Sequence, residues 1–200
     1  MQYSYSRPTI KCNTWLISCS DINIIYQFVK RKFQNKNPSF HLETNSGNNR
    51  KYDSFKEFEK DLSDIKKLKE EITKILIQGS SFDVNYHSYI IVSIDFVGYQ
   101  PEARFSLASE GKNNKKDWVD GAYEEMNRIA KSFILSDNMK CLLEKEYGLK
   151  HHDHFVIQDF WGEKRKRLET ILEKQHDVPS NISGNIIINS QIQQKTSASN

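Results

Sequence analysis

The stretch from Ile72 to Phe133 places the strongest constraint on how this chain can fold. It contains three strand-like segments, Ile72–Gln78, Tyr89–Val97 and Ala103–Ser109. An amphipathic helix is predicted after them, from Asp117 to Phe133, with a buried stripe that begins at its tryptophan. Neighbouring strands joined by polar loops form an antiparallel meander, and a helix with one apolar face covers one side of it. This block therefore predicts an α+β core, and it contains no recognisable reaction motif.

Four further elements are predicted before this block. Thr14–Cys19 is short, apolar and rich in strand formers, and a helix follows it with Ser20 or Asp21 as its cap. Ser39–Thr44 predicts another strand, which returns through a turn that contains a Ser-Gly pair. Ser54 then begins a capping box and a second helix.

The residues between this second helix and the first long strand support two interpretations. Ile65, Leu68, Ile72 and Ile75 have the spacing of a helix face, yet residues 72–77 also alternate as a strand does. Because a Gly-Ser-Ser turn signal and a further alternating segment follow, we predict a strand that ends at Gly79.

The residues after the core predict helices. One helix starts at Ser136 or Asp137 and stops at Gly148, and a charged helix runs from Glu163 to about Gln175. The charged helix has a narrow apolar stripe, which is typical of a helical appendage or a partner-binding seam. The residues of this stripe are Leu168, Ile171 and Leu172.

The composition changes at Pro179, where charge and aromatic residues almost disappear. Such a polar tract cannot build a core. Residues 184–194 nevertheless have strong strand propensity and no charge, which is typical of a segment that adds to a sheet edge or pairs with itself. Its candidate partner-binding residues are Ile186, Ile187, Ile188 and Ile192.

These patterns predict a fold class and three regions. The fold is α+β, with a mostly antiparallel sheet packed by about three helices on one face. Residues 1–148 form this domain, residues 149–178 a helical extension, and residues 179–200 a low-complexity tail that is flexible or self-pairing.

The amino-acid composition limits where in the cell the protein is expected and which class of partner it is expected to bind. The chain has 200 residues and a formal net charge of +3, which gives no general argument for nucleic acid. It shows neither a secretion signal nor an apolar run long enough to cross a bilayer. Cys12, Cys19 and Cys141 form no CxxC pair, as expected for reduced thiols. We therefore expect a cytoplasmic protein with no membrane association.

Histidines after the core are the candidate metal ligands. His151, His152 and His154 surround Asp153, and all four are ligand types. A zinc site needs three or four ligands that converge tetrahedrally, and neighbouring histidines rarely do so unaided. A solvated loop between helices is the simpler interpretation, so we predict no bound metal and no cofactor.

Two acidic residues on the strands raise the alternative of a metal-dependent nuclease. Asp95 lies in the best strand and Glu102 begins the next one. No lysine follows Asp95 in the (D/E)xK pattern, and two-metal chemistry needs further acids in a known geometry. The sequence also lacks GxSxG, GxxxxGK[ST] and GxGxxG, so nucleophilic catalysis and phosphate-cradling loops are not indicated. We predict no catalytic residue.

Two lysine- and arginine-rich segments raise the alternative of a nucleic-acid-binding module. Counterion release at such segments gives weak, salt-dependent binding. In the second segment, neighbouring glutamates favour a solvated helix with i,i+4 ion pairs. The residues are Lys112, Lys115 and Lys116 in the first segment, and Lys164, Arg165, Lys166 and Arg167 in the second.

One resemblance is confined to the tail. Residues 189–194 (NSQIQQ), which follow the GNIII of residues 184–188, resemble tails of bacterial phage-defence and mobile-element proteins of the AbiTii type. The resemblance implies a genomic setting among defence loci and is compatible with self-association. It does not extend to the rest of the chain, and it implies no catalytic residue.

The function that these observations favour is a non-enzymatic interaction or oligomerisation module of the bacterial cytosol, in an antiphage defence system. Its partner would be another protein, a second copy, or both. The motivation is a well-formed core, no catalytic motif, and two C-terminal segments suited to association. The alternatives are the nuclease and the nucleic-acid-binding module.

Overall fold

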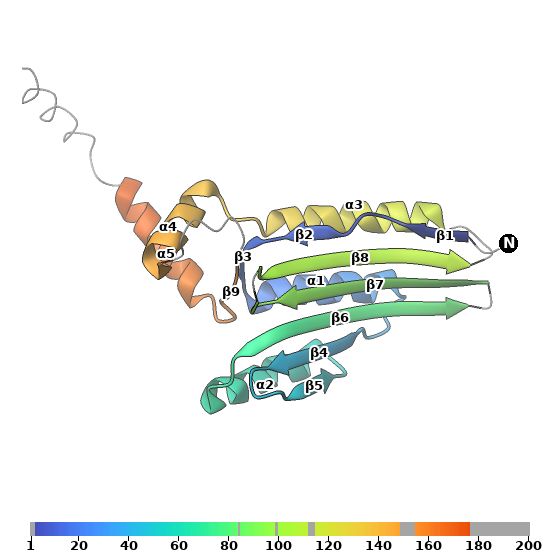
Figure 1. Cartoon of the computed structure of the whole chain (residues 1–200), viewed down its shortest axis with the longest axis horizontal. Coiled ribbons are helices and arrows are strands. Elements are labelled where there is room, and N and C mark those ends of the chain that lie inside the picture. The colour runs from blue at the N-terminus through green and yellow to red at the C-terminus, as the bar shows by residue number, and fades with distance from the viewer. Residues whose placement is uncertain (1–2, 84, 99, 112–114, 149–154, 177–200) are drawn as a thin grey trace, which may run out of the picture.

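A computed structural model describes residues 3–83, 85–98, 100–111, 115–148 and 155–176 (Figure 1). Within them, one sheet of seven strands has the order β1-β8-β7-β6-β4-β5, with β2 beside β1 on the same edge of β8. All of its pairs are antiparallel, which confirms the predicted α+β class. Its strands are β1 (Tyr3–Ser6), β2 (Ile10–Cys12), β4 (Ser39–Thr44), β5 (Asn49–Tyr52), β6 (Ile72–Asp83), β7 (Tyr86–Asp95) and β8 (Glu102–Gly111).

Three helices cover one face of this sheet, as predicted. They are α1 (Cys19–Lys32), α2 (Phe55–Leu68) and α3 (Lys116–Ser132). Figure 1 shows α1 behind β6 and β7 and α2 behind β4 and β5, while the near face of the sheet carries no helix. The alternation of buried and exposed side chains along β7 follows from this arrangement, because only one face is covered.

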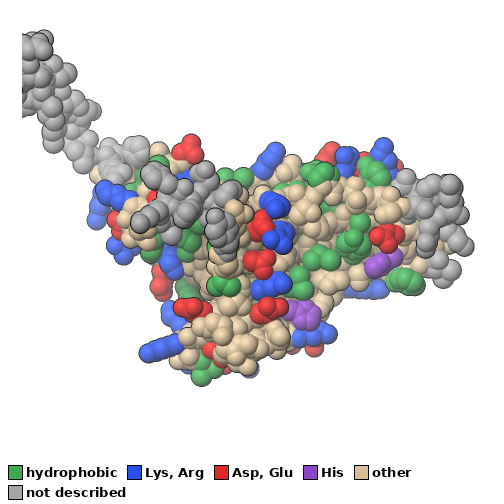
Figure 2. All heavy atoms as spheres, viewed as in Figure 1, with side chains coloured by type: hydrophobic (Ala, Val, Ile, Leu, Met, Phe, Trp, Pro, Cys, Tyr) green, Lys and Arg blue, Asp and Glu red, His purple; other side chains and the backbone are tan. Residues whose placement is uncertain are grey.

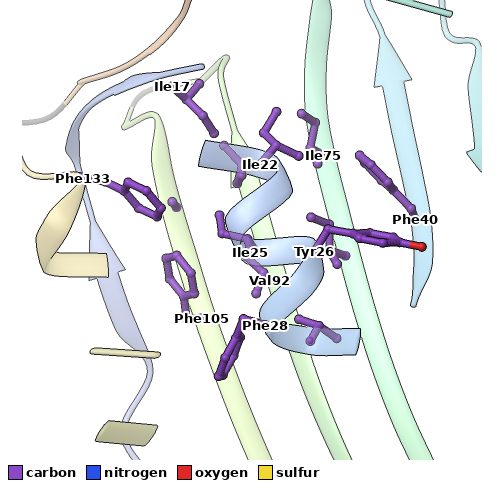
Figure 3. Packing of buried hydrophobic residues seen from close by; sticks show 14 of the residues in the cluster. Ile17, Ile22, Ile25, Tyr26, Phe28, Phe40, Ile75, Val92, Phe105 and Phe133 are labelled. Carbon is purple, nitrogen blue, oxygen red and sulfur yellow. The ribbon is translucent and has the colours of Figure 1, made fainter. Parts of the chain in front are cut away.

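The core lies between α1 and the central strands. Ile22, Ile25 and Phe28 of α1 are at most 1% exposed. Figure 3 shows them directed at side chains of the sheet, among them Val92 and Phe105. Burial of each such side chain contributes roughly 1.5–3 kcal/mol, so this contact contributes substantially to stability.

The start of α1 differs from the prediction. The cap is Ser18 rather than Ser20 or Asp21, and Ser18 and Asp21 form a capping box. Asp21 Oδ2 accepts a hydrogen bond from the Ser18 backbone N at 2.8 Å. The strand before the helix is accordingly shorter than predicted, because Cys19 already belongs to the helix. This strand is β3 (Thr14–Ile17).

The strand β6 is longer than predicted. It passes through Gly79 and pairs with β7 as far as Asp83, so the predicted end at Gly79 is wrong. A Cβ atom at Gly79 would lie 2.4 Å from the ring of Phe33 and 2.6 Å from Val29. Glycine is therefore present because α1 approaches the strand closely, and it does not mark a turn.

Two helices and a short parallel pair of strands form the other end of the molecule. The helices are α4 (Asp137–Tyr147) and α5 (Glu163–His176), and β9 (Phe155–Gln158) pairs parallel to β3. Leu16, Leu143 and Leu168 are fully buried in a second hydrophobic cluster here. Phe160 joins the main core, so residues beyond 148 supply both a strand and core side chains.

Candidate functional site

The side of the sheet that none of the described helices covers is here called the open face. Because side chains alternate along a strand, β6, β7 and β8 each present every second residue to it. The strand register brings these residues into rows across the sheet. Figure 2 shows acidic and basic side chains gathered over one part of this face, and apolar side chains toward the right-hand end, with a histidine and an acidic side chain among them.

A charged row crosses the open face. Lys74, Asp95 and Glu102 are register partners on β6, β7 and β8. Glu102 accepts hydrogen bonds from Arg104 and lies 3.5 Å from Lys11 Nζ. The charged row, defined as these five residues, contains three cations and two anions and is therefore nearly neutral.

Glu102 is the most buried carboxylate of the charged row, at 8% exposure. Burial alone would raise its pKa. The hydrogen bond and the positive charge of Arg104, together with Lys11, outweigh burial and hold the pKa of Glu102 below its ordinary value. Glu102 is therefore ionised at neutral pH and bound to two cations.

An apolar band lies beside the charged row and consists of Leu76, Phe82, Tyr89 and Ile91. Phe82 is 85% exposed, the highest value among the exposed large hydrophobic residues of the described chain. The ring of His87 lies 5.8 Å from both the Phe82 ring and the Tyr89 ring. A row of aromatic rings that faces solvent is typical of an interaction surface.

The nuclease candidates Asp95 and Glu102 do lie side by side. Glu102 is bound to Arg104 and Lys11, and Asp95 accepts a hydrogen bond from Ser93 at 3.2 Å. Within the described parts of the chain, no group of three or more His, Cys, Asp or Glu side chains is arranged to hold a metal ion. Glu102 is thus held by ion pairs, and Asp95 lies beside it with Ser93 as a hydrogen-bond donor.

Several predicted site residues lie outside the described residues. These are the histidine cluster, one lysine of the first basic segment and the tail isoleucines, namely His151, His152, His154, Lys112, Ile186, Ile187, Ile188 and Ile192. Their roles stay predictions. The other two lysines of that segment, Lys115 and Lys116, lie at the start of α3.

The basic segment of α5 is largely engaged within the chain. Lys164 Nζ donates to the Gln158 carbonyl at 2.9 Å, and Arg165 Nη2 donates to the Leu16 carbonyl at 2.7 Å. Arg167 pairs with Glu146 of α4 at 2.8 Å. Only Lys166 has no side-chain partner of this kind among the described residues. These side chains hold α5 in place, which explains the sequence pattern without nucleic acid.

The apolar stripe of α5 also packs inside the molecule. Leu168 is fully buried, and Ile171 and Leu172 pack against the same cluster. Their partners are Leu142 and Leu143 of α4, so the seam predicted for a partner protein is covered by the chain itself.

The three cysteines are free. Burial raises the pKa of Cys12 to about 11, and burial together with the charge of Glu59 raises that of Cys19 to about 11. Both thiols are therefore protonated at neutral pH and poor nucleophiles.

The apolar band is the feature that sequence reasoning missed. The signal was the continuation of alternation past Gly79, through Ser80 and Phe82, which a Gly-Ser-Ser turn signal obscured.

Comparisons with protein-family models, with curated proteins and with solved structures found no match for this chain. No helix among the described residues is long and apolar enough to cross a membrane.

Proposed function

We propose that this chain is a protein-interaction module, and that its open face binds the same face of a second copy. The observation that supports this proposal most strongly is Phe82, which is 85% exposed at the end of a row of rings that continues through His87 to Tyr89. Exposed phenylalanine costs free energy in solution, and covering it in an interface recovers roughly 1.5–3 kcal/mol per side chain.

The charge pattern favours a second copy over an unlike partner. A two-fold interface places the same patch on both sides, so the patch must be complementary to itself. The charged row meets this requirement because it contains both acids and bases, and Lys74 of one copy can face Asp95 of the other. A strongly acidic or basic partner would instead select a face of one sign.

The size of the open face suits sheet-on-sheet packing. At about 3.4 Å per residue and about 4.8 Å between strands, β4, β6, β7 and β8 offer roughly 600 Å² before side-chain relief is added. Stable interfaces bury about 800 Å² on each partner, so most of this face must be covered. Two such faces pack about 10 Å apart in β-sandwiches.

Sedimentation velocity over a concentration series tests this proposal. The native chain should shift from monomer to dimer as its concentration rises. The variant Phe82→Ser should raise the dimer Kd at least about a hundredfold, because a two-fold interface contains the residue twice. The control is Leu68→Ser on α2, which is also exposed, at 64%, but lies away from the open face.

Two results would contradict the proposal. One is a chain that stays monomeric at every concentration. The other is a dimer that Phe82→Ser leaves intact but that deletion of residues 179–200 dissociates, which would assign association to the tail. The bacterial, cytosolic and antiphage setting expected from the sequence is a separate proposal, which identification of the neighbouring genes tests.

A further inference from the structure

A lysine-lined cavity lies between the end of α1 and the start of α3, at the right-hand end of the molecule in Figure 1. Its volume is about 230 Å³. Among the described residues that line it, none is acidic. The polar residues around it are Lys32, Gln34, Lys36, Lys115, Ser81, Ser88 and Tyr86.

The lysines of this cavity differ in how strongly they are already bound. Lys32 pairs with Glu125 of α3 at 2.7 Å, so its charge is largely offset. Lys36 and Lys115 make no ion pair with a carboxylate among the described residues. Lys115 Nζ instead lies 3.3 Å from the centre of the Tyr86 ring, which holds the ammonium at the mouth of the cavity. Two cations are therefore available to an anion.

Fixed donors and partial charges add to these cations. Ser88 is buried and shares a 2.9 Å hydrogen bond with Ser109, so its hydroxyl has a fixed position in the cavity wall. No side chain caps the first turn of α3, and the positive end of that helix dipole lies beside Lys115. Anions are stabilised at such helix ends.

The other residues that line the cavity indicate what kind of molecule would carry the anionic group. Phe33 and Trp118 form an aromatic wall, with ring centres 5.7 Å apart. A neighbouring hollow of about 350 Å³ shares Phe33 and Lys36 with the cavity and has uncharged polar walls that include Asn37 and Gln78. The hydroxyl-bearing part of a small molecule would fit this hollow, because Asn37 and Gln78 offer neutral hydrogen-bonding groups.

From these contacts we infer a binding site for a small phosphate-bearing molecule, with its phosphate held between Lys36 and Lys115. The cavity that holds the phosphate is lined from the helix-covered side of the sheet, whereas the neighbouring hollow includes Gln78 and Ser80, which strand alternation places on the open face. An extended nucleic acid is disfavoured because the cavity is concave and the cations beside it, Arg31 and Lys32, are both paired with Glu125.

A two-dimensional ¹H–¹⁵N NMR titration of the full chain tests this site. The probes are inorganic phosphate, ribose 5-phosphate and, as the uncharged control, ribose. Ribose 5-phosphate should shift the amide signals of Ser81, Ser88 and Trp118 in a saturable way, whereas ribose should not. Lys36→Gln and Lys115→Gln should each weaken binding at least about tenfold, since each removes a charge-assisted hydrogen bond.

The matched control is Lys56→Gln, an exposed lysine of α2, which should change the affinity less than about twofold. Circular dichroism checks that each variant is folded. The inference is overturned if neither phosphate probe shifts these signals up to about 10 mM, or if Lys56→Gln has the same effect as the cavity variants. A single-stranded oligonucleotide that binds these residues more tightly than ribose 5-phosphate would also overturn it.

Discussion

Each buried carboxylate among the described residues has specific partners. Asp21 bonds the Ser18 backbone, Asp159 accepts from the backbone N of Lys164 and Arg165 at 2.9 Å, and Glu102 binds Arg104. A buried charge without partners costs several kcal/mol, so these contacts are required for folding. Asp21 and Asp159 fix the starts of α1 and α5, whereas Glu102 holds its cationic neighbours in the charged row.

The lowered pKa of Glu102 predicts the direction in which folding stability changes with pH. Its pKa lies below the ordinary 4.5, so the folded state gains stability above that pH and loses it as the pH falls through the lowered pKa. In Arg104→Gln the burial of Glu102 remains while its main partner is lost, so its pKa should rise above the native one. A ¹³C NMR titration of the Glu102 carboxyl measures this.

The control for this titration is Lys74→Gln. Lys74 lies in the same charged row, but its register partners are Glu43 and Asp95, and it makes no ion pair with Glu102 among the described contacts. An equal rise of the Glu102 pKa in both variants would mean that general charge, and not the contact with Arg104, sets it.

At the scale of the elements, sequence periodicity predicts those helices and strands whose own residues carry a clear apolar pattern. The alternation of β7 and β8 and the apolar stripe of α3 each carry their own signal, so these elements were predictable within a few residues. The strand β9 was not, because its four residues gain their structure from β3, which is distant in the sequence. The strand β1, with the sequence Tyr-Ser-Tyr-Ser, is an edge strand whose pairing comes from β8.

Helix starts show the same limit. The sequence predicted that α3 begins at Asp117, and the helix begins one residue earlier, at Lys116, with no side-chain cap. Ser136 does cap α4 and Gly148 ends it in the left-handed conformation, as predicted. Capping residues are common in sequences, so which of several candidates acts depends on where the preceding strand ends.

The close approach of α1 to β6 gives a prediction at this scale. In Gly79→Ala the new Cβ atom would clash with Phe33 and Val29, whose side chains lie 2.4–2.6 Å from its position. Overpacking of this kind costs about 1–3 kcal/mol, and urea unfolding should show a loss in that range. Gly121→Ala is the control, because nothing lies within 4 Å of its Cβ position. A loss at Gly79 no greater than at Gly121 would contradict this account of the contact.

At the scale of the whole molecule, the fold separates two surfaces that the sequence could not reveal. The apolar band requires the register of β6 against β7, since Phe82 meets His87 only when the hairpin extends to Asp83. The lysine cavity requires Lys36 and Lys115, distant in sequence, to meet at one end of the sheet. Of the two segments that looked suited to association, the apolar stripe of α5 is instead used for internal packing, and the tail lies outside the described residues.

The central claim about function is therefore that the open face is the interaction surface. Helices cover one side of the sheet and internal contacts occupy α5, whereas Phe82 and its neighbours have no cover among the described residues. A chain that kept such a face permanently in water would expose an aggregation-prone sheet surface.

The most direct test is an isotope-filtered NOE experiment on a mixture of labelled and unlabelled chain. It detects contacts between protons of different copies only. We predict intermolecular NOEs from the methyl groups of Leu76 and Ile91 to aromatic ring protons of the other copy, and their loss in Phe82→Ser. Intermolecular NOEs confined to the helices, or none at concentrations where the chain sediments as a dimer, would contradict the account.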